Sequence, residues 1–293
     1  MQASTCGVRS GSSSAGGTRS GLASADPSAA GTLSELPGDA FLALGIGGGS
    51  ARLGAYARAI RDVLALGGPP SGQASASGIS VSGLLGAILA PWDALTQDTA
   101  QARRDFQRWM GPAAIFAAGS GLLDLRAALV ISSSDASASR AAVAKLADAL
   151  RLRGAVVQPV SIPGTDAAAE ARLEQLPIAL VIAAGRDSLG QAKFVLGLGE
   201  ASVTTVLQRS TTLGGVAAAA SAAAALGEGI KPSALLQVPT LLSLLEGVGL
   251  TEDATLAPLL PYLRAISSVY AGSRDLGGGA QRLRAVVELR EAS

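Results

Sequence analysis

Two hydrophobic periods run along the chain, and they predict where helices and strands lie. Between residues 50 and 66, Leu53, Ala57 and Ile60 recur every three or four positions, with the charged residues elsewhere. This spacing predicts an amphipathic helix that begins with Ser50 as its N-cap. The same period predicts further helices over residues 82–90, 91–109, 137–152, 201–208, 214–226 and 240–248.

Short apolar runs bounded by glycine or polar turns predict the strands. Three pairs of runs are joined by short connections and predict β-hairpins: 113–118 with 125–131, 177–184 with 194–198, and 265–271 with 283–289. Single strands are predicted over 40–46, 155–162 and 234–238. Hairpin strands are antiparallel, and the predicted helices fall between the pairs. The fold class is therefore predicted to be α+β, with an antiparallel sheet built from hairpins and helices packed on it.

The composition of the chain changes near residue 35. Residues 1–34 are dominated by Ser, Gly, Ala and Thr and show no apolar period, so we predict a disordered tail. The turn signal Leu36-Pro37-Gly38-Asp39 then opens the folded part, and residues 67–78 are predicted to form a loop. We expect one α+β domain over residues 35–293, which could divide into two similar α+β units near residue 153.

The overall composition is that of a folded protein, and it narrows the choice of partner. Hydrophobic residues make up 48% of the 293 positions and charged residues 15%, which excludes a wholly disordered chain. The 23 Lys and Arg nearly balance the 22 Asp and Glu, and aromatic residues are only 3%. Neither a basic patch nor an array of aromatic side chains is visible, so we expect no nucleic acid partner.

The sequence gives no support for membrane insertion or for a disulfide. The longest apolar runs, residues 83–90 and 110–123, are shorter than the roughly 20 residues of a spanning helix. We expect no transmembrane segment and no signal peptide in this chain. Cys6 is the only cysteine, which excludes an intrachain disulfide, and no apolar segment precedes it as a lipidation signal requires.

The residue types that common catalytic sites require are missing. The chain has no histidine and one cysteine, which excludes Ser-His-Asp and Cys-His catalysis and ordinary zinc coordination. The run from Gly45 to Ser50 follows a predicted strand and opens a helix, as a dinucleotide-binding turn does. However, Ser50 occupies the third glycine position, and no second strand ending in an acidic residue follows. A flexible turn is the better interpretation, as it is for Ser120 between its two glycines.

Carboxylates and lysines are the remaining candidates for acid–base chemistry. Glu170 and Glu174 are four residues apart and could share a face of a helix, but the segment is short and its neighbours Arg172 and Gln175 indicate a solvated face. No pattern singles out the other candidates, which are Asp124, Asp135, Asp187, Lys145, Lys193 and Lys231. We therefore predict no catalytic, cofactor-binding or metal-binding residues and no cofactor. Both tryptophans, Trp92 and Trp109, are expected in the core.

Several motifs resemble a known bacterial family. The run that begins Leu-Pro-Ile at residues 176–187, Phe-Val-Leu-Gly-Leu-Gly at 194–199, and Thr-Leu-Gly at 212–214 before an Ala-rich helix resemble the uncharacterised domain-of-unknown-function family three-three-five-two. Met-Gly-Pro-Ala-Ala at 110–114 and Ala-Leu-Val-Ile at 128–131, followed by Asp135, are similar to its preceding unit, so the resemblance covers roughly residues 36–291. Members often carry an N-terminal membrane anchor before a repeated α+β region, and they have no assigned catalytic residues. The resemblance therefore implies the C-terminal portion of an anchored protein, extracytoplasmic or membrane-associated.

Two hypotheses for function rank ahead of an enzyme. The first is a non-catalytic envelope-associated or protein-interaction domain, and the alternative is a carrier that binds an apolar small molecule or lipid between helices and sheet. A carboxylate-only hydrolase is the least favoured. The helices at 216–226 and 240–248 contain Glu246 as their only charge, so we expect them to be buried through residues such as Leu241 and Leu244. A filled core with an exposed apolar patch favours the interaction domain, and an internal cavity favours the carrier.

Overall fold

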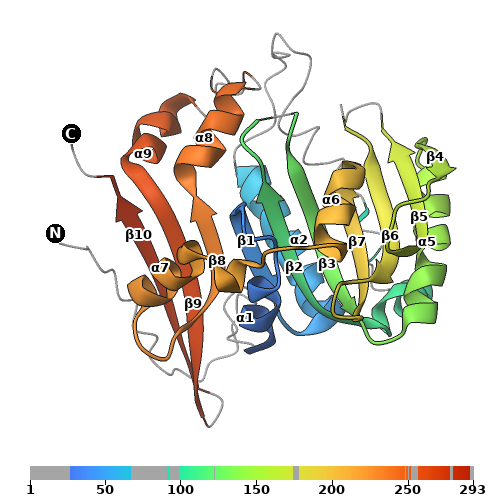
Figure 1. Ribbon diagram of the computed structural model, residues 1–293, viewed down its shortest axis with the longest axis horizontal. Helices are drawn as coiled ribbons and strands as arrows, with labels where there is room; N and C mark the ends of the chain where they lie inside the picture. Colours follow the sequence, from blue (N-terminus) through green and yellow to red (C-terminus); the bar gives the residue numbers. More distant parts are fainter. Residues whose placement is uncertain are drawn as a thin grey trace.

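In the part of the chain that the structure describes, ten strands form one sheet, and every neighbouring pair is antiparallel (Figure 1). The computed structural model describes residues 27–66, 91–92, 95, 99–121, 123–173, 178–247, 249, 251, 257–277 and 280–290. The strands are β1 (Ala40–Ile46), β2 (Met110–Ala118), β3 (Arg126–Ser133), β4 (Val156–Pro159), β5 (Thr165–Arg172), β6 (Leu180–Arg186), β7 (Ala192–Leu198), β8 (Lys231–Gln237), β9 (Ile266–Gly277) and β10 (Ala280–Leu289). The predicted α+β class is confirmed.

The strand order shows how the sheet is assembled from hairpins. Neighbours follow the order β10-β9-β8-β1-β2-β3-β7-β6-β5-β4. All three predicted hairpins are present, as β2–β3, β6–β7 and β9–β10. Hairpin strands pair readily because only a short loop must close. Residue 153 lies between α5 (Ala136–Arg151) and β4, and the sheet continues without a break on both sides of this position in the sequence.

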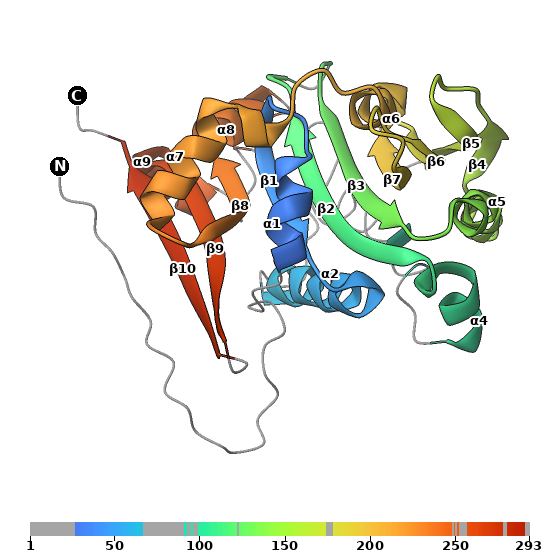
Figure 2. The same ribbon diagram turned by 60° about the horizontal axis from the view of Figure 1, so that its bottom comes forward.

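Helices cover both faces of the sheet (Figure 2). The face that we call the α5 face carries α2 (Gly49–Leu66), α4 (Ala100–Ala102), the π-helix η2 (Arg103–Gln107) and α5. The opposite face, the α6 face, carries α1 (Pro27–Ser34), α6 (Gly199–Leu207), η3 (Leu213–Gly215) and α7 (Ala217–Leu226). Strand β3 serves both layers because strand side chains alternate: Leu129 and Ile131 pack on the α5 face, and Ala128 and Val130 on the α6 face.

The core of the α5 face is built around Trp109. Its ring is buried, and the ring centroid lies 5.1 Å from that of Phe194 at an interplanar angle of 50°. Helix α5, which the sequence predicts over residues 137–152, buries an apolar stripe from Val143 to Leu150. Asp135 caps this helix, because its side chain accepts a hydrogen bond of 2.9 Å from the N–H of Ala138. The predictions of this helix and of buried tryptophans are confirmed.

The prediction of a disordered tail up to residue 34 is wrong for its last eight residues. They form α1, which buries Ala29 and Leu33 and packs on β1, β2 and β8. Gly45 of β1 permits this contact, because a Cβ at this position would lie 1.9 Å from the carbonyl oxygen of Ala29. The Ser- and Gly-rich composition concealed the helix, although a glycine inside a strand is typical of close backbone approach. Residues 1–26 lie outside the described part of the chain.

Other boundaries also differ from the prediction. Glu170 lies on strand β5, not on a helix, because pairing with β4 and β6 overrides the helical propensity of this Ala-rich segment. Helix α2 begins at Gly49, one residue before the predicted cap. The helix predicted over 91–109 is interrupted, since α4 passes into η2 and then into a turn at Arg108. Glu174, the loop predicted at 67–78 and the helix predicted at 82–90 lie outside the described residues.

A third apolar cluster lies at one end of β8 and β9, where α8 (Val238–Gly247) and α9 (Leu260–Ala265) pack. The 3-10 helix η5 (Ala257–Leu259) directly precedes α9. Leu236 and Val269 join this cluster on the α5 side, whereas their neighbours in the strands face α7. Leu242 is the buried leucine of α8, so the expectation for Leu241 and Leu244 is corrected: both are only half-buried. No helix among the described residues is long and apolar enough to cross a bilayer.

Candidate functional site

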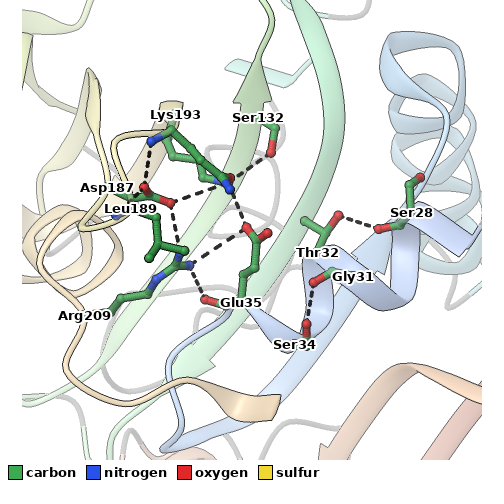
Figure 3. Close-up of polar contacts among 11 residues, drawn as sticks. Ser28, Gly31, Thr32, Ser34, Glu35, Ser132, Asp187, Leu189, Lys193 and Arg209 are labelled. Atoms are coloured by element: carbon green, nitrogen blue, oxygen red, sulfur yellow. Dashed lines mark hydrogen bonds and ion pairs between the residues drawn. The ribbon is translucent and has the colours of Figure 1, made fainter. Parts of the chain in front are cut away.

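Four charged side chains from distant parts of the chain meet on the α6 face (Figure 3). Lys193 lies on β7, Asp187 in the β6–β7 turn, Arg209 after α6, and Glu35 after α1. Lys193 points to the same face as Val195, two residues further along the strand. The side chains of Lys193 and Asp187 are 2% and 0% exposed. We call these four residues the ionic cluster.

The cations of the ionic cluster are both hydrogen-bonded to its anions. The Lys193 Nζ donates to Glu35 Oε2 at 2.8 Å and lies 3.8 Å from Asp187 Oδ2. Ser132 Oγ and Gln191 Oε1 accept the other two hydrogen bonds of the ammonium group, each at 3.1 Å. Arg209 donates to Asp187 Oδ2 at 2.9 Å and to the carbonyl oxygen of Glu35 at 2.6 Å.

The backbone of the β6–β7 turn fixes the second oxygen of Asp187. Its Oδ1 accepts hydrogen bonds from the N–H groups of Leu189 at 3.0 Å and Gln191 at 2.9 Å. An aspartate that bonds to the backbone two residues on is typical of a tight turn. The turn therefore holds the carboxylate in one orientation toward Lys193 and Arg209.

This arrangement holds the fold together and has no space for a substrate. Two cationic and two anionic side chains balance, and buried charge is tolerated when it is paired and hydrogen-bonded. The cavity lined by Thr32, Glu35, Lys193 and Arg209, among others, measures about 10 Å³, which is at the lower limit for one water molecule. The ionic cluster thus ties α1 to the β6–β7 turn and to the end of α6.

Two of the four residues of the ionic cluster, Asp187 and Lys193, were candidates from the sequence, and the structure brings them together. Glu35 and Arg209 were missed, because Glu35 lies 158 residues from Lys193 and 174 from Arg209 along the chain. The one sequence signal was Lys193 itself, a charged residue between apolar strand neighbours. Such a residue needs a partner when the strand is covered on both faces.

The other candidates are engaged locally. Asp124 accepts hydrogen bonds from the backbone N–H groups of Ser120 and Gly121, which lower the pKa of its carboxyl group and close the β2–β3 turn. The rest are dispersed: Asp135 caps α5, Glu170 pairs with Arg172, Lys145 pairs with Asp105, and Lys231 begins β8. Among the residues that the structure describes, no group of three acidic, histidine or cysteine side chains could hold a metal ion.

An open depression of about 610 Å³ lies beside the start of α2, with Ser50, Arg103, Arg104 and Arg108 in its lining. The dinucleotide-turn motif ends here, but β1 is flanked by β2 and β8, which are both antiparallel to it. A dinucleotide turn needs a parallel βαβ unit. The turn interpretation of Gly45 to Ser50 therefore fits the sheet topology, and the three arginines are exposed to solvent.

The two edges of the sheet differ in length and in protection. The edge strand β4 has four residues and ends at Pro159, which has no N–H group to donate to a further strand. The edge strand β10 has ten residues, and the odd-numbered side chains from Leu283 to Leu289 form an apolar row on the α5 side. In this row Leu283, Val287 and Leu289 are 46%, 45% and 65% exposed. We call the outward backbone of β10, together with this row, the β10 edge.

The other face of β10 is closed. Val286 and its partner Tyr270 are buried with α7, and Arg284 donates a hydrogen bond of 2.7 Å to the carbonyl oxygen of Leu226. α7 itself buries Ala222 and Leu226, while most of its other alanines face solvent. Of the two faces of β10, the apolar one is thus the more exposed.

Comparison of the chain with protein-family models, with curated proteins and with solved structures gives no match. The resemblance to the domain-of-unknown-function family, and the envelope location that it implies, therefore stay predictions.

Proposed function

We propose that this chain is a non-catalytic protein-interaction domain that binds its partner along the β10 edge. The observation that supports the proposal is the row of three large apolar side chains on a ten-residue edge strand. Natural proteins usually protect such edges with prolines, charges or short strands, because an exposed edge recruits another strand. Strand β4 is short and ends at a proline, whereas the charges of β10 lie on its α7 side and leave the opposite side apolar. An apolar row that is left exposed is typical of an interaction surface.

The two alternatives have weaker support. A carrier requires an enclosed apolar cavity of several hundred Å³. The depression of about 610 Å³ is open and lined by arginines, and the pocket beside the ionic cluster is about 10 Å³. A carboxylate-only hydrolase requires two carboxyl groups across a substrate. Asp187, the most buried candidate, is fully engaged by Arg209 and by the backbone of its own turn.

Site-specific photo-crosslinking in cells tests the proposal. A benzophenone side chain at Val287, in the β10 edge, should capture a protein, since this position is 45% exposed in the apolar row. The matched control is Val156, a 70% exposed valine on β4 at the other edge of the sheet. We expect a discrete product from position 287 and none from 156. No product from 287, or the same product from both positions, would contradict the proposal.

A further inference from the structure

The backbone of β10 directs alternate hydrogen-bonding groups out of the sheet. The N–H of Arg290 donates to the carbonyl oxygen of Ala265 at 2.9 Å, and the carbonyl oxygen of Glu288 accepts from Ser267 Oγ at 3.0 Å. Even-numbered residues of β10 therefore direct their backbone groups toward β9. Because these groups alternate in an antiparallel ladder, those of Leu283, Ala285 and Val287 point outward.

A second copy of the chain can bind these outward groups with two-fold symmetry. Two β10 strands pair antiparallel about an axis perpendicular to the sheet, so that each exchanges the same contacts with the other. Both copies then keep their apolar rows on the same face. Each possible register is defined by the residue that lies on the axis and faces itself.

The charges on the even-numbered face of β10 favour one register among those centred on residues 283–287, which overlap most of the strand. With Ala285 on the axis, Arg282 lies opposite Glu288 of the second copy, and Leu283 lies opposite its Val287. With Arg284 on the axis, that arginine faces itself. With Leu283 on the axis, Arg282 faces Arg284. With Val286 on the axis, Arg284 faces Glu288, but Arg282 faces Arg290. With Val287 on the axis, Arg284 faces Arg290. Since like charges directly opposite each other are destabilising, the Ala285 register is favoured.

The surroundings of Arg282 and Glu288 also favour this pairing. Arg282 lies opposite Arg274 within the β9–β10 hairpin, so a carboxylate from a second copy offsets a repulsion between like charges. Glu288 Oε2 accepts a hydrogen bond of 2.6 Å from Ser268, and a carboxylate offers about four acceptor positions. It can therefore accept from a guanidinium group as well.

We infer that β10 pairs with β10 of a second copy about a two-fold axis at Ala285, which joins two sheets into one continuous sheet. The inference rests on the proposed function and names its partner. The outward N–H and C=O groups gain hydrogen bonds, and the apolar rows of the two copies become contiguous. The dimer interface is thus a strand pair with one ion pair at each end.

Sedimentation velocity of the purified full chain tests the inference. We expect a wild-type dimer, and we expect Arg282→Glu and Glu288→Arg each to raise the dissociation constant about tenfold or more, because each change makes two symmetry-related pairs repulsive. The double variant, with both changes, should restore wild-type association. Circular dichroism and thermal melting serve as fold controls, since Glu288→Arg also removes the bond to Ser268.

The register has a separate readout in disulfide formation. In a Cys6→Ser background, Ala285→Cys should cross-link two copies on oxidation, because only the residue on the axis faces itself at about 5.5 Å between Cα atoms. Leu289→Cys, on the same face of the same strand, should not. A monomeric wild type would overturn the inference, while a different protein captured from position 287 would leave the proposed function standing. A dimer that the double variant fails to restore would overturn the register.

Discussion

Replacing Asp187 by asparagine removes one negative charge from the ionic cluster and nearly preserves the shape of the side chain. An asparagine keeps an oxygen for the N–H groups of Leu189 and Gln191, so the turn is retained and the negative charge is lost. The distances to the cations are 2.9 Å for Arg209 and 3.8 Å for Lys193. At an effective dielectric constant of about 20, these pairs attract by roughly 6 and 4 kcal/mol.

Two effects reduce the net loss of stability. The asparagine avoids the desolvation of a carboxylate, which costs several kcal/mol. Glu35 also remains beside both cations. We therefore expect Asp187→Asn to lower the free energy of unfolding by about 3 kcal/mol, the lower end of the range for a broken buried ion pair. With a urea dependence of about 3 kcal/mol per molar, the denaturation midpoint should fall by roughly 1 M.

The control is the same substitution in an exposed pair. Asp148 pairs with Arg151 on the solvent side of α5, and both side chains are largely exposed. Asp148→Asn should change the free energy of unfolding by less than about 0.5 kcal/mol. Equal midpoints for the two variants in urea denaturation followed by circular dichroism would refute a structural role for the ionic cluster.

A hydrogen bond from Lys145 lowers the pKa of Asp105 below its usual value of 3.8, so this contact stabilises the fold above that pH and is lost as the pH falls through the lowered pKa. Lys145→Met should raise that pKa in a carboxyl NMR titration, and an unchanged pKa would contradict this cause. Gly45→Ala should destabilise by about 1–3 kcal/mol because its Cβ would meet the backbone of α1, whereas Gly31→Ala, with nothing within 4 Å, should stabilise that helix by roughly 0.5–1 kcal/mol. If the thermal midpoints of these two variants shift in the same direction, the close contact between Gly45 and α1 is refuted. Leu242→Asp should destabilise by roughly 3 kcal/mol or more as an unpaired buried charge, and a melting temperature equal to that of the wild type would exclude burial of this leucine.

Local patterns predicted most elements of this fold. The three hairpins were visible because the period of two and the turn residues are adjacent in the sequence. Helix α1 was missed because its small and polar residues give almost no apolar period, although Ala29 and Leu33 are buried. Strand β5 was missed because alanine favours helices, and only its neighbours in the sheet make it extended.

Contacts between residues far apart in the sequence could not be predicted from local patterns. Glu35 and Lys193 are 158 residues apart, and no periodicity connects them. The strand order likewise depends on pairings such as β1 with β8, which no local signal specifies. The exposure of Leu283 and Val287 was also hidden, because an apolar strand residue is usually buried and only the sheet edge shows otherwise.

The position of β1 between β2 and β8 has a consequence for the synthesis of the chain. Leu42 pairs with Leu236, so one side of β1 cannot form its ladder until most of the polypeptide has left the ribosome. At about 5–20 residues per second, that wait is roughly 10–40 s. During this time the nascent β1–β2–β3 meander has an unpaired hydrophobic edge strand, and unpaired edges of this kind make folding intermediates prone to aggregation.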